Sequence, residues 1–364
     1  MKISIQPFEP EHEPAVAAFN RRMRTGKAPS TFLLPERAKP PVRVGGITVT
    51  HHVAVDDTGE VRGGVMCMEH PAIVGGTIRP TINIQAPLSE GIIDPAFMLV
   101  GPQLIKHVTR TCPHVFVVGM GGAANPLPRL LKALGWTLHT VPFYFRILHA
   151  GRCVRQLAPL RTSRARRLAA AVAAASGGAA LGAAIVHRSA PEAKRTAAAF
   201  EAQPVTDWNG SDAIWNTFAP QLKFGVLRTA ATLPFFYERA GSPQAWWLMR
   251  NGRPEGWFGL LVTKMSGNPY FGDLAVATLT DCVGTPDAVR AAPLLAARAA
   301  LEQGADLVIT NQQHRLVREA CANAGWRGSA SNFLVATSRA LSAEYDVDTS
   351  YVTRRDGDGL TNLR

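Results

Sequence analysis

The chain has 364 residues, 46% of them hydrophobic and 18% charged, a globular composition long enough for two ordinary domains. Its five cysteines show no CxxC spacing, which excludes a zinc ribbon or a disulfide scaffold and favours a reducing compartment. The first residues, MKISIQPFEPEHEP, turn acidic where a signal peptide carries its apolar run, so we expect a cytoplasmic protein.

The first half of the chain predicts strands and helices that alternate after an initial hairpin. The turn in VDDTGEVRGG holds residues that tolerate positive φ, a hairpin signal. After it, a fully apolar strand indicates a buried sheet position, and Gly135-Trp136 marks a helix end. The expected elements are strands at 47–56, 61–74, 80–92 and 114–120, a helix at 101–111, a second helix ending at Gly135, and one or two closing strands.

The segment 151–200 carries most of the positive charge. Nine Arg or Lys face one acid, Glu192, so this segment holds eight of the twelve net charges. Within it, 168–186 is an uncharged Ala- and Gly-rich run that just reaches the length of a membrane span. Three interpretations remain open: a connecting helix or flexible linker, association of 152–188 with an anionic membrane surface at the inner face, or a true span.

The second half repeats the first at low identity. PLSEGIIDPAFMLVGPQL (87–104) aligns with TLTDCVGTPDAVRAAPLL (278–295) at an offset of 191 residues. Gly135-Trp136 matches Gly325-Trp326 at an offset of 190, and the two hairpin turns match at 193. The expected elements are strands at 244–250, 256–264, 270–283 and 306–311, and helices at 292–303 and before Gly325.

These elements predict an α/β protein with mixed sheets, present as two similar domains that arose by internal duplication. We expect an N-terminal domain at 1–150, a basic Ala-rich linker at 151–200, a C-terminal domain at 201–345 and a polar tail at 346–364.

The order of elements resembles the GCN5-related N-acetyltransferase (GNAT) family, present twice. IIDPAFMLVGPQL resembles the turn and loop whose amides hold the pyrophosphate of coenzyme A in that family. NPLPRLLKALGW resembles the family's helix that opens at an Asn and closes at Gly-aromatic. The resemblance covers roughly 45–150 and 244–340, and it implies acetyl-CoA or another acyl-CoA as co-substrate.

The resemblance points to Gly101, Gln103 and Asn125 as cofactor contacts. The loop departs from the family pattern, because its first basic or amide residue is missing and Pro102 removes one amide donor. Pro is nevertheless favoured at a helix start, where free N–H groups and a partial positive charge suit an anion. The second repeat has Ala292 in place of Gly101, so the first repeat is the better candidate for the cofactor.

Acyl transfer to an amine requires a base for the amine and a proton for the leaving thiolate. The resemblance assigns the base to an acid on the third strand, where Glu90 and Asp281 occupy matched positions. The proton donor of the family is a helix Tyr, and Leu131 or Cys321 stands there instead, so only Cys321 could donate. A solvent-facing or capping acid and a core cysteine are the structural alternatives.

A second resemblance links VLRTAATLPFFYERAGSP to tandem GNAT-like proteins associated with bacterial exopolysaccharide biosynthesis, and suggests Arg228 and Tyr237 as substrate contacts. The leading hypothesis is therefore an acyl-CoA-dependent N-acyltransferase acting on an amine, such as an amino sugar or envelope-polysaccharide precursor. One alternative resembles FemAB-type aminoacyl-tRNA-dependent transferases, with tRNA as partner. The other is a catalytically silent module that binds a partner or a membrane surface. No metal site is expected.

Overall fold

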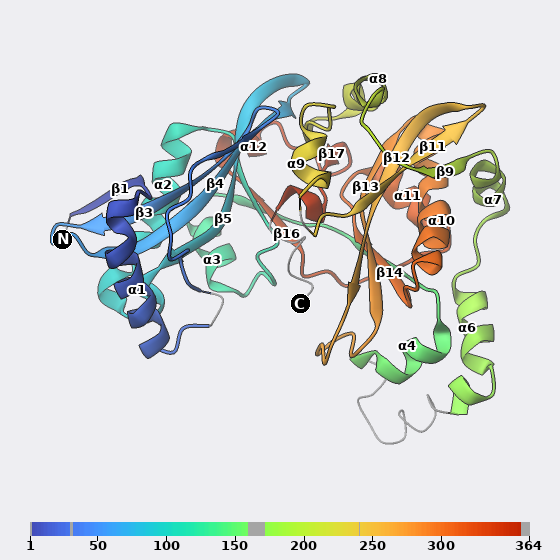
Figure 1. The fold of residues 1–364 in the computed structure, drawn as a ribbon, viewed down its shortest axis with the longest axis horizontal. Coiled ribbons are helices and arrows are strands. Elements are labelled where there is room, and N and C mark those ends of the chain that lie inside the picture. The colour runs from blue at the N-terminus through green and yellow to red at the C-terminus, as the bar shows by residue number, and fades with distance from the viewer. Residues whose placement is uncertain (1, 30–31, 159–171, 240, 358–364) are drawn as a thin grey trace. The chain divides into compact units, whose positions relative to one another are not determined.

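The computed structural model describes residues 2–29, 32–158, 172–239 and 241–357 and divides the chain into two compact units (Figure 1). Unit 1 consists of Met1–His139 and Leu334–Tyr345, and unit 2 of Thr140–Phe333 and Asp346–Arg364. Each unit holds a mixed sheet with helices packed against it, so the predicted α/β class with two domains is confirmed.

The sheet of unit 1 has the strand order β1-β3-β4-β5-β6-β16-β7, with β2 beside β3. β3, β4 and β5 form an antiparallel meander, whereas β5 and β6 run parallel. The strands are β1 (Ile3–Pro7), β2 (Val42–Val44), β3 (Ile47–Asp56), β4 (Val61–Val74), β5 (Thr77–Ser89), β6 (Val115–Val118), β7 (Thr137–Thr140) and β16 (Leu334–Thr337). The helical segments are η1 (Pro10–His12), α1 (Glu13–Thr25), η2 (Glu90–Ile92), η3 (Pro95–Phe97), α2 (Val100–Thr111), α3 (Pro126–Ala133) and α12 (Arg339–Ser342).

The predicted hairpin at 47–56 and 61–74 is confirmed at both strands. Its turn is built as the sequence suggested, because the Asp56 carboxylate accepts from the backbone N–H groups of Thr58 and Glu60 at 2.9 and 3.0 Å. Gly59 takes φ +84°, which a residue without Cβ adopts without strain.

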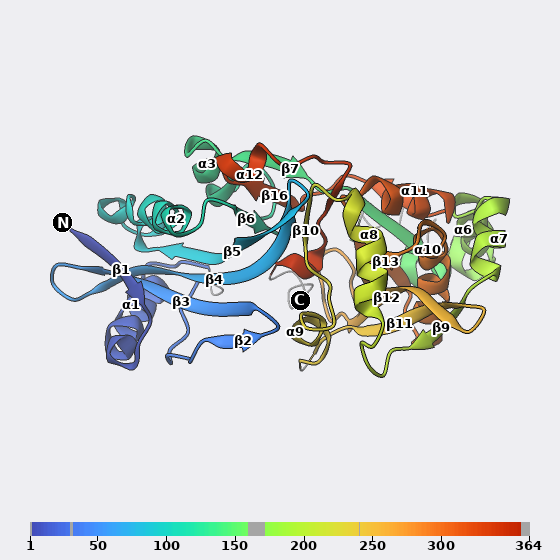
Figure 2. The ribbon, with the colours of Figure 1, turned by 90° about the horizontal axis from the view of Figure 1, so that it is seen from above.

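Alternate residues of β3 supply two separate cores. Ala54 packs in the cluster that contains Leu104 of α2, while Val53 and Val55 pack with Phe19 of α1. Since successive strand residues point to opposite faces, α1 and α2 cover opposite faces of the sheet, as Figure 2 shows.

The sheet of unit 2 has the order β15-β8-β14-β13-β12-β11-β9, and β10 pairs in parallel with β17. The strands are β8 (Phe143–Ile147), β9 (Glu201–Pro204), β10 (Phe224–Val226), β11 (Gln244–Arg250), β12 (Arg253–Lys264), β13 (Ala275–Gly284), β14 (Leu307–Asn311), β15 (Arg327–Ser329) and β17 (Ser350–Tyr351). The helical segments are α4 (Ala150–Gln156), α6 (Gly178–Val186), α7 (Pro191–Ala198), α8 (Ser211–Phe218), η5 (Ala219–Gln221), α9 (Leu233–Tyr237), α10 (Pro286–Glu302), α11 (Arg315–Asn323) and η6 (Arg354–Asp356).

The closing strands of the two halves are exchanged. β8 follows the first Gly-Trp motif in the chain, yet it pairs with β14 and β15 in unit 2. β16 follows the second motif and pairs with β6 in unit 1. Each sheet is therefore completed by a strand from the other half of the sequence.

The two Gly-Trp motifs end their helices in the same way. Gly135 and Gly325 take φ +82° and +78°. The N–H of Trp136 donates to the Leu131 carbonyl at 3.0 Å, and that of Trp326 to the Cys321 carbonyl at 2.9 Å. Both ends match the predicted left-handed glycine cap. The duplication itself stays a prediction.

The basic segment contains α4, α6 and α7. Residues 159–171, which hold four of its arginines and the start of the 168–186 run, lie outside the described residues. In the part of the chain that is described, no helix is long and apolar enough to cross a membrane.

Candidate active site

In each unit, the two strands of one parallel pair are paired over only two or three residues and then diverge. β5 and β6 pair at two positions, ending at Asn83 and Phe116. β13 and β14 pair at three, ending at Thr278 and Ile309. We name the diverging ends fork 1 (84–89 of β5 with 117–118 of β6) and fork 2 (279–284 of β13 with 310–311 of β14). Ligands of α/β sheets bind outside the carboxyl ends of such strands, so the forks are the candidate sites.

Helix α2 begins beside fork 1. Gly101 and Gln103 both lie in its first turn and are half-buried. Met98 and Leu99, just before it, are 62% and 64% exposed, and no acidic residue occupies the turn. A Cβ added to Gly101 would lie 3.5 Å from the Leu130 side chain, an ordinary contact, so the position does not require glycine. The N–H groups and partial positive charge of this helix start are suited to an anion.

Asn125 shapes the loop between β6 and α3. It stands at the N-cap position of α3, and its Nδ2 donates to the Met120 carbonyl at 3.1 Å. Gly121 takes φ +71°, and a Cβ there would lie 2.4 Å from Nδ2 of Asn125. Asn125 therefore holds the loop in place, while a cofactor contact from its exposed side chain stays a prediction.

Glu90 is a buried partner of two arginines. Its Oε1 accepts from Nε of Arg22 at 2.7 Å, and its Oε2 accepts from Nη2 of Arg22 at 3.1 Å and from Nη1 of Arg62 at 3.2 Å. The side chain is only 4% exposed. Both carboxylate oxygens of Glu90 thus already accept hydrogen bonds from guanidinium groups. One oxygen would have to lose these bonds before Glu90 could take a proton from an amine.

Fork 2 lacks the predicted helix start. The expected helix at 292–303 is wrong at its beginning, because α10 starts at Pro286. The Thr285 hydroxyl caps it by accepting from the N–H of Ala288 at 3.3 Å, and Pro286 supplies a preset φ. Ala292 and Pro293 consequently lie inside the helix, both buried, and cannot form a phosphate loop.

The C-terminal segment fills fork 2. The hydroxyl of Tyr351, a fully buried residue, accepts from the backbone N–H of Cys282 at 2.8 Å and donates to Oδ1 of Asp281 at 3.1 Å. Thr353 forms a β-bridge with Gln312, directly after β14. Among the described residues of unit 1, no side chain bonds in this way to the backbone of 84–88. Fork 2 is therefore occupied by the chain itself.

Arg228 and Tyr237, the predicted substrate contacts, meet at Asp281. Nε of the buried Arg228 donates to Oδ1 of Asp281 at 3.2 Å, and its Nη2 donates to Oδ1 of Asp356 at 2.7 Å. Tyr237 donates its hydroxyl proton to Oδ2 of Asp281 at 2.7 Å. This cluster is internally satisfied, so it has the form of a structural ion-pair network.

The electrostatics of the cluster follow from burial and from these pairs. Burial opposes the charge on Arg228, yet Asp281 and Asp356 outweigh it and raise the pKa of the guanidinium. Burial and the neighbouring Asp281 raise the pKa of Tyr237 well above its ordinary value. Burial also raises the pKa of Asp356. Tyr237 is therefore a neutral hydrogen-bond donor near neutral pH.

Cys321, the candidate proton donor, is fully buried in α11, and burial raises the pKa of its thiol. Leu131 holds the equivalent place in α3 and is also fully buried. Among the described residues, no group of three His, Cys, Asp or Glu side chains is arranged to hold a metal ion. The proton donor of any acyl transfer thus stays a prediction.

Sequence reasoning missed the residues of the C-terminal segment. Tyr351, Arg355 and Asp356 are at most 4% exposed, although 346–364 reads as polar. The apolar pair Tyr351-Val352, between charged stretches, was the one available signal.

No family model and no curated protein matches the chain. Among solved structures, a GCN5-related N-acetyltransferase from Anabaena variabilis aligns over 92% of this chain and 72% of its own length, with a TM-score of 0.51 and 10% identity. The glucosamine N-acetyltransferase region of a fungal multi-domain GH3 β-N-acetylglucosaminidase aligns over 92% of this chain and 38% of that protein, with a TM-score of 0.53 and 11% identity. At such identities the likeness establishes the fold alone. The chain has a GNAT-like fold, as its sequence predicted.

Proposed function

We propose that the chain is an acyl-CoA-dependent N-acyltransferase with a single cofactor site, at fork 1. The observation that carries the proposal is the difference between the forks of this GNAT-like fold. Fork 2 holds Tyr351, and its helix begins with the acidic Asp287, which repels a phosphate. Helix α2 at fork 1 begins without an acid and beside exposed apolar side chains.

The start of α2 would hold the pyrophosphate of the acyl-CoA. Backbone N–H groups near Gly101 and the amide of Gln103 are the proposed contacts, and the exposed Met98 and Leu99 would cover the apolar part of the cofactor. Asn125 would keep the loop after β6 in its present conformation.

In the proposed reaction the nitrogen of a neutral amine attacks the thioester carbonyl. A C–N bond forms, the C–S bond breaks, and the coenzyme A thiolate leaves with a proton lost by the nitrogen. Glu90 serves as the base only if Arg22 or Arg62 releases one of its oxygens. The proposed acceptor is an amino sugar or a related amine, which the glucosamine N-acetyltransferase neighbour supports.

The test is a thermal-shift titration of the full chain with acetyl-CoA and with longer acyl-CoA. A ligand at one hundred times its Kd stabilises the native state by about 2.7 kcal/mol. Gln103→Glu places an acid at the start of α2 and should weaken binding about three- to tenfold. Gln303→Glu, the same change on the exposed surface of unit 2, is the matched control and should bind like the unaltered chain.

Activity is read as thiol released from acetyl-CoA when glucosamine is added. The absence of a thermal shift with every acyl-CoA up to millimolar concentration would refute the proposal. If the two Gln→Glu variants weaken binding equally, the cofactor does not bind at the start of α2.

A catalytically silent binding module is the second candidate. The ion pairs of Glu90 and the burial of Cys321 favour it, because neither group stands ready for proton transfer. It predicts a thermal shift with acyl-CoA and no thiol release with any amine.

A further inference from the structure

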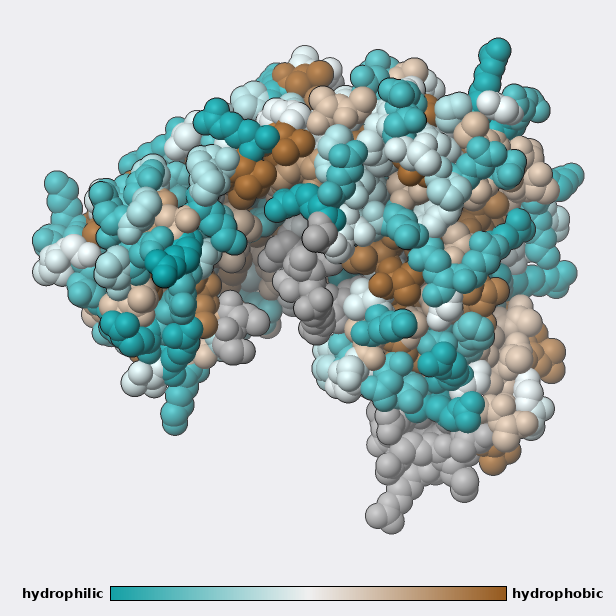
Figure 3. Space-filling model, in the orientation of Figure 1, coloured by the Kyte–Doolittle hydropathy of each residue, from teal (hydrophilic) through white to brown (hydrophobic). Residues whose placement is uncertain are grey.

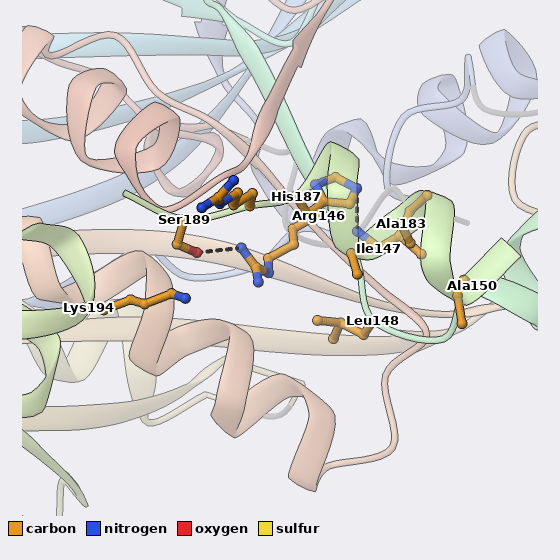
Figure 4. Close-up of a pocket in the computed structure, with 11 residues that line it drawn as sticks. Arg146, Ile147, Leu148, Ala150, Ala183, His187, Ser189 and Lys194 are labelled. Carbon is orange, nitrogen blue, oxygen red and sulfur yellow. Dashed lines mark hydrogen bonds between the residues drawn. The ribbon is translucent and has the colours of Figure 1, made fainter. Parts of the chain in front are cut away.

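A pocket of about 390 Å³ lies in unit 2 between β8, α6 and the start of α7 (Figure 4). Its volume suits a small ligand. Among the described residues, three cationic side chains line it and no carboxylate does. The polar and charged lining residues are Arg146, His187, Arg188, Ser189 and Lys194.

Arg146 is a half-buried cation that pairs with no carboxylate among the described residues. Its Nη1 donates to Oγ of Ser189 at 3.2 Å and to the carbonyl of Ala324. These bonds fix the guanidinium plane, yet they use only neutral acceptors. Burial lowers the pKa of Arg146, which reflects a cation without a counter-charge. An anion in the pocket would supply that charge.

His187 positions the wall of the pocket. Its Nε2 accepts from the N–H of Ile147 at 3.3 Å, and its Nδ1 lies 2.9 Å from the Gly325 carbonyl. Because one nitrogen accepts, the other must carry the proton, and the ring is neutral. Burial accordingly lowers the pKa of His187. The histidine therefore ties the end of α6 to β8 and adds no charge.

Lys194 and Arg188 complete the positive lining. In Figure 4 the Lys194 ammonium and the Arg146 guanidinium extend toward the same space. Both Lys194 and Arg188 are exposed, so they can adjust to a ligand. Three cations around one opening match the charge and acceptor oxygens of a phosphate monoester, which carries nearly two negative charges.

We propose that this pocket binds a phosphate group, independently of the cofactor site at fork 1. This phosphate can belong to a phospholipid or to a soluble compound, and the outer face of α6 distinguishes these two ligands. Leu181 and Ile185 are each 66% exposed there, and Figure 3 shows α6 as a tan and brown area. A phospholipid headgroup would place its acyl chains against this apolar face, whereas a soluble phosphorylated compound would leave it in water.

The test uses the full chain, with inorganic phosphate in thermal-shift titrations and vesicles of phosphatidylcholine with or without phosphatidic acid in co-sedimentation. Lys194→Gln should weaken phosphate binding about three- to tenfold. Arg195→Gln is the matched control, since Arg195 is exposed on the same helix and does not line the pocket. Ile185→Gln should leave phosphate binding unchanged.

Two outcomes support the site and name the source. Binding to phosphatidic acid vesicles that Ile185→Gln abolishes identifies a lipid headgroup. Phosphate binding sensitive to Lys194→Gln, without any vesicle binding, identifies a soluble phosphate. The site is refuted if Lys194→Gln and Arg195→Gln weaken binding equally, or if neither probe binds.

Discussion

Replacing Arg228 by Met tests whether the cluster around Asp281 holds unit 2 together. The Arg228 side chain is fully buried, and it faces two carboxylates whose side chains are 0% and 1% exposed. Met fills a similar volume without a charge. The substitution therefore leaves Asp281 and Asp356 buried without their shared partner.

Breaking a buried ion pair by removing one member costs about 3–5 kcal/mol of unfolding free energy. Arg355 stays in place and offsets part of the unpaired charge, so we expect the lower end of this range. Arg250→Met is the matched control. Arg250 also binds two carboxylates, at 2.6 and 3.2 Å, but its side chain is 31% exposed, and such pairs contribute about 0–1 kcal/mol.

Urea denaturation followed by tryptophan fluorescence measures the difference. Six of the seven tryptophans lie in unit 2, so the signal reports that unit. The deficit of Arg228→Met should shrink as the pH falls, because Asp356, whose pKa burial already raises, can then take up a proton. Equal losses for Arg228→Met and Arg250→Met would show that burial of the cluster does not matter for stability.

Three further predictions follow from single features. Glu90→Gln should lower the unfolding free energy by about 2 kcal/mol in urea titrations, because Arg22 and Arg62 lose their shared counter-charge. Burial lowers the pKa of His314 to about 4 from its ordinary 6.5. As the pH falls from 6.5 toward 4, the unfolded chain therefore takes up this proton before the native chain does. The unfolding free energy drops by about 1.4 kcal/mol per pH unit in this range, and His314→Gln should reduce that pH dependence. All five cysteines are buried, so a thiol reagent should label the native chain slowly and all five sites in urea.

Local signals predicted the elements of the fold well. Turn residues fixed the first hairpin, and glycine before Trp136 and Trp326 marked two helix ends. The predicted helix start at residue 292 was wrong, because Pro293 was interpreted as a proline in the first turn of that helix. A proline inside a helix normally costs a hydrogen bond. Here the Val289 carbonyl that it leaves free lies 3.7 Å from the Cys282 thiol, which donates to it.

Distant contacts could not be predicted in the same way. The pair of Arg228 with Asp356 joins residues 128 positions apart, and the exchange of β8 and β16 between the sheets leaves no local pattern. A closing strand has the same short apolar sequence whichever sheet it enters. Only the packing of the whole chain distinguishes the two arrangements.

The matched acids Glu90 and Asp281 show how one sequence signal supports two roles. An acid at the same place in both halves suggests a catalytic base, yet each side chain is at most 4% exposed and accepts from an arginine. An acid kept to hold a guanidinium produces the same match. The Glu90→Gln variant distinguishes these two roles. A base predicts a loss of thiol release beyond the change in the folded fraction, whereas an ion-pair anchor alone predicts lost stability and thiol release that changes only with the folded fraction.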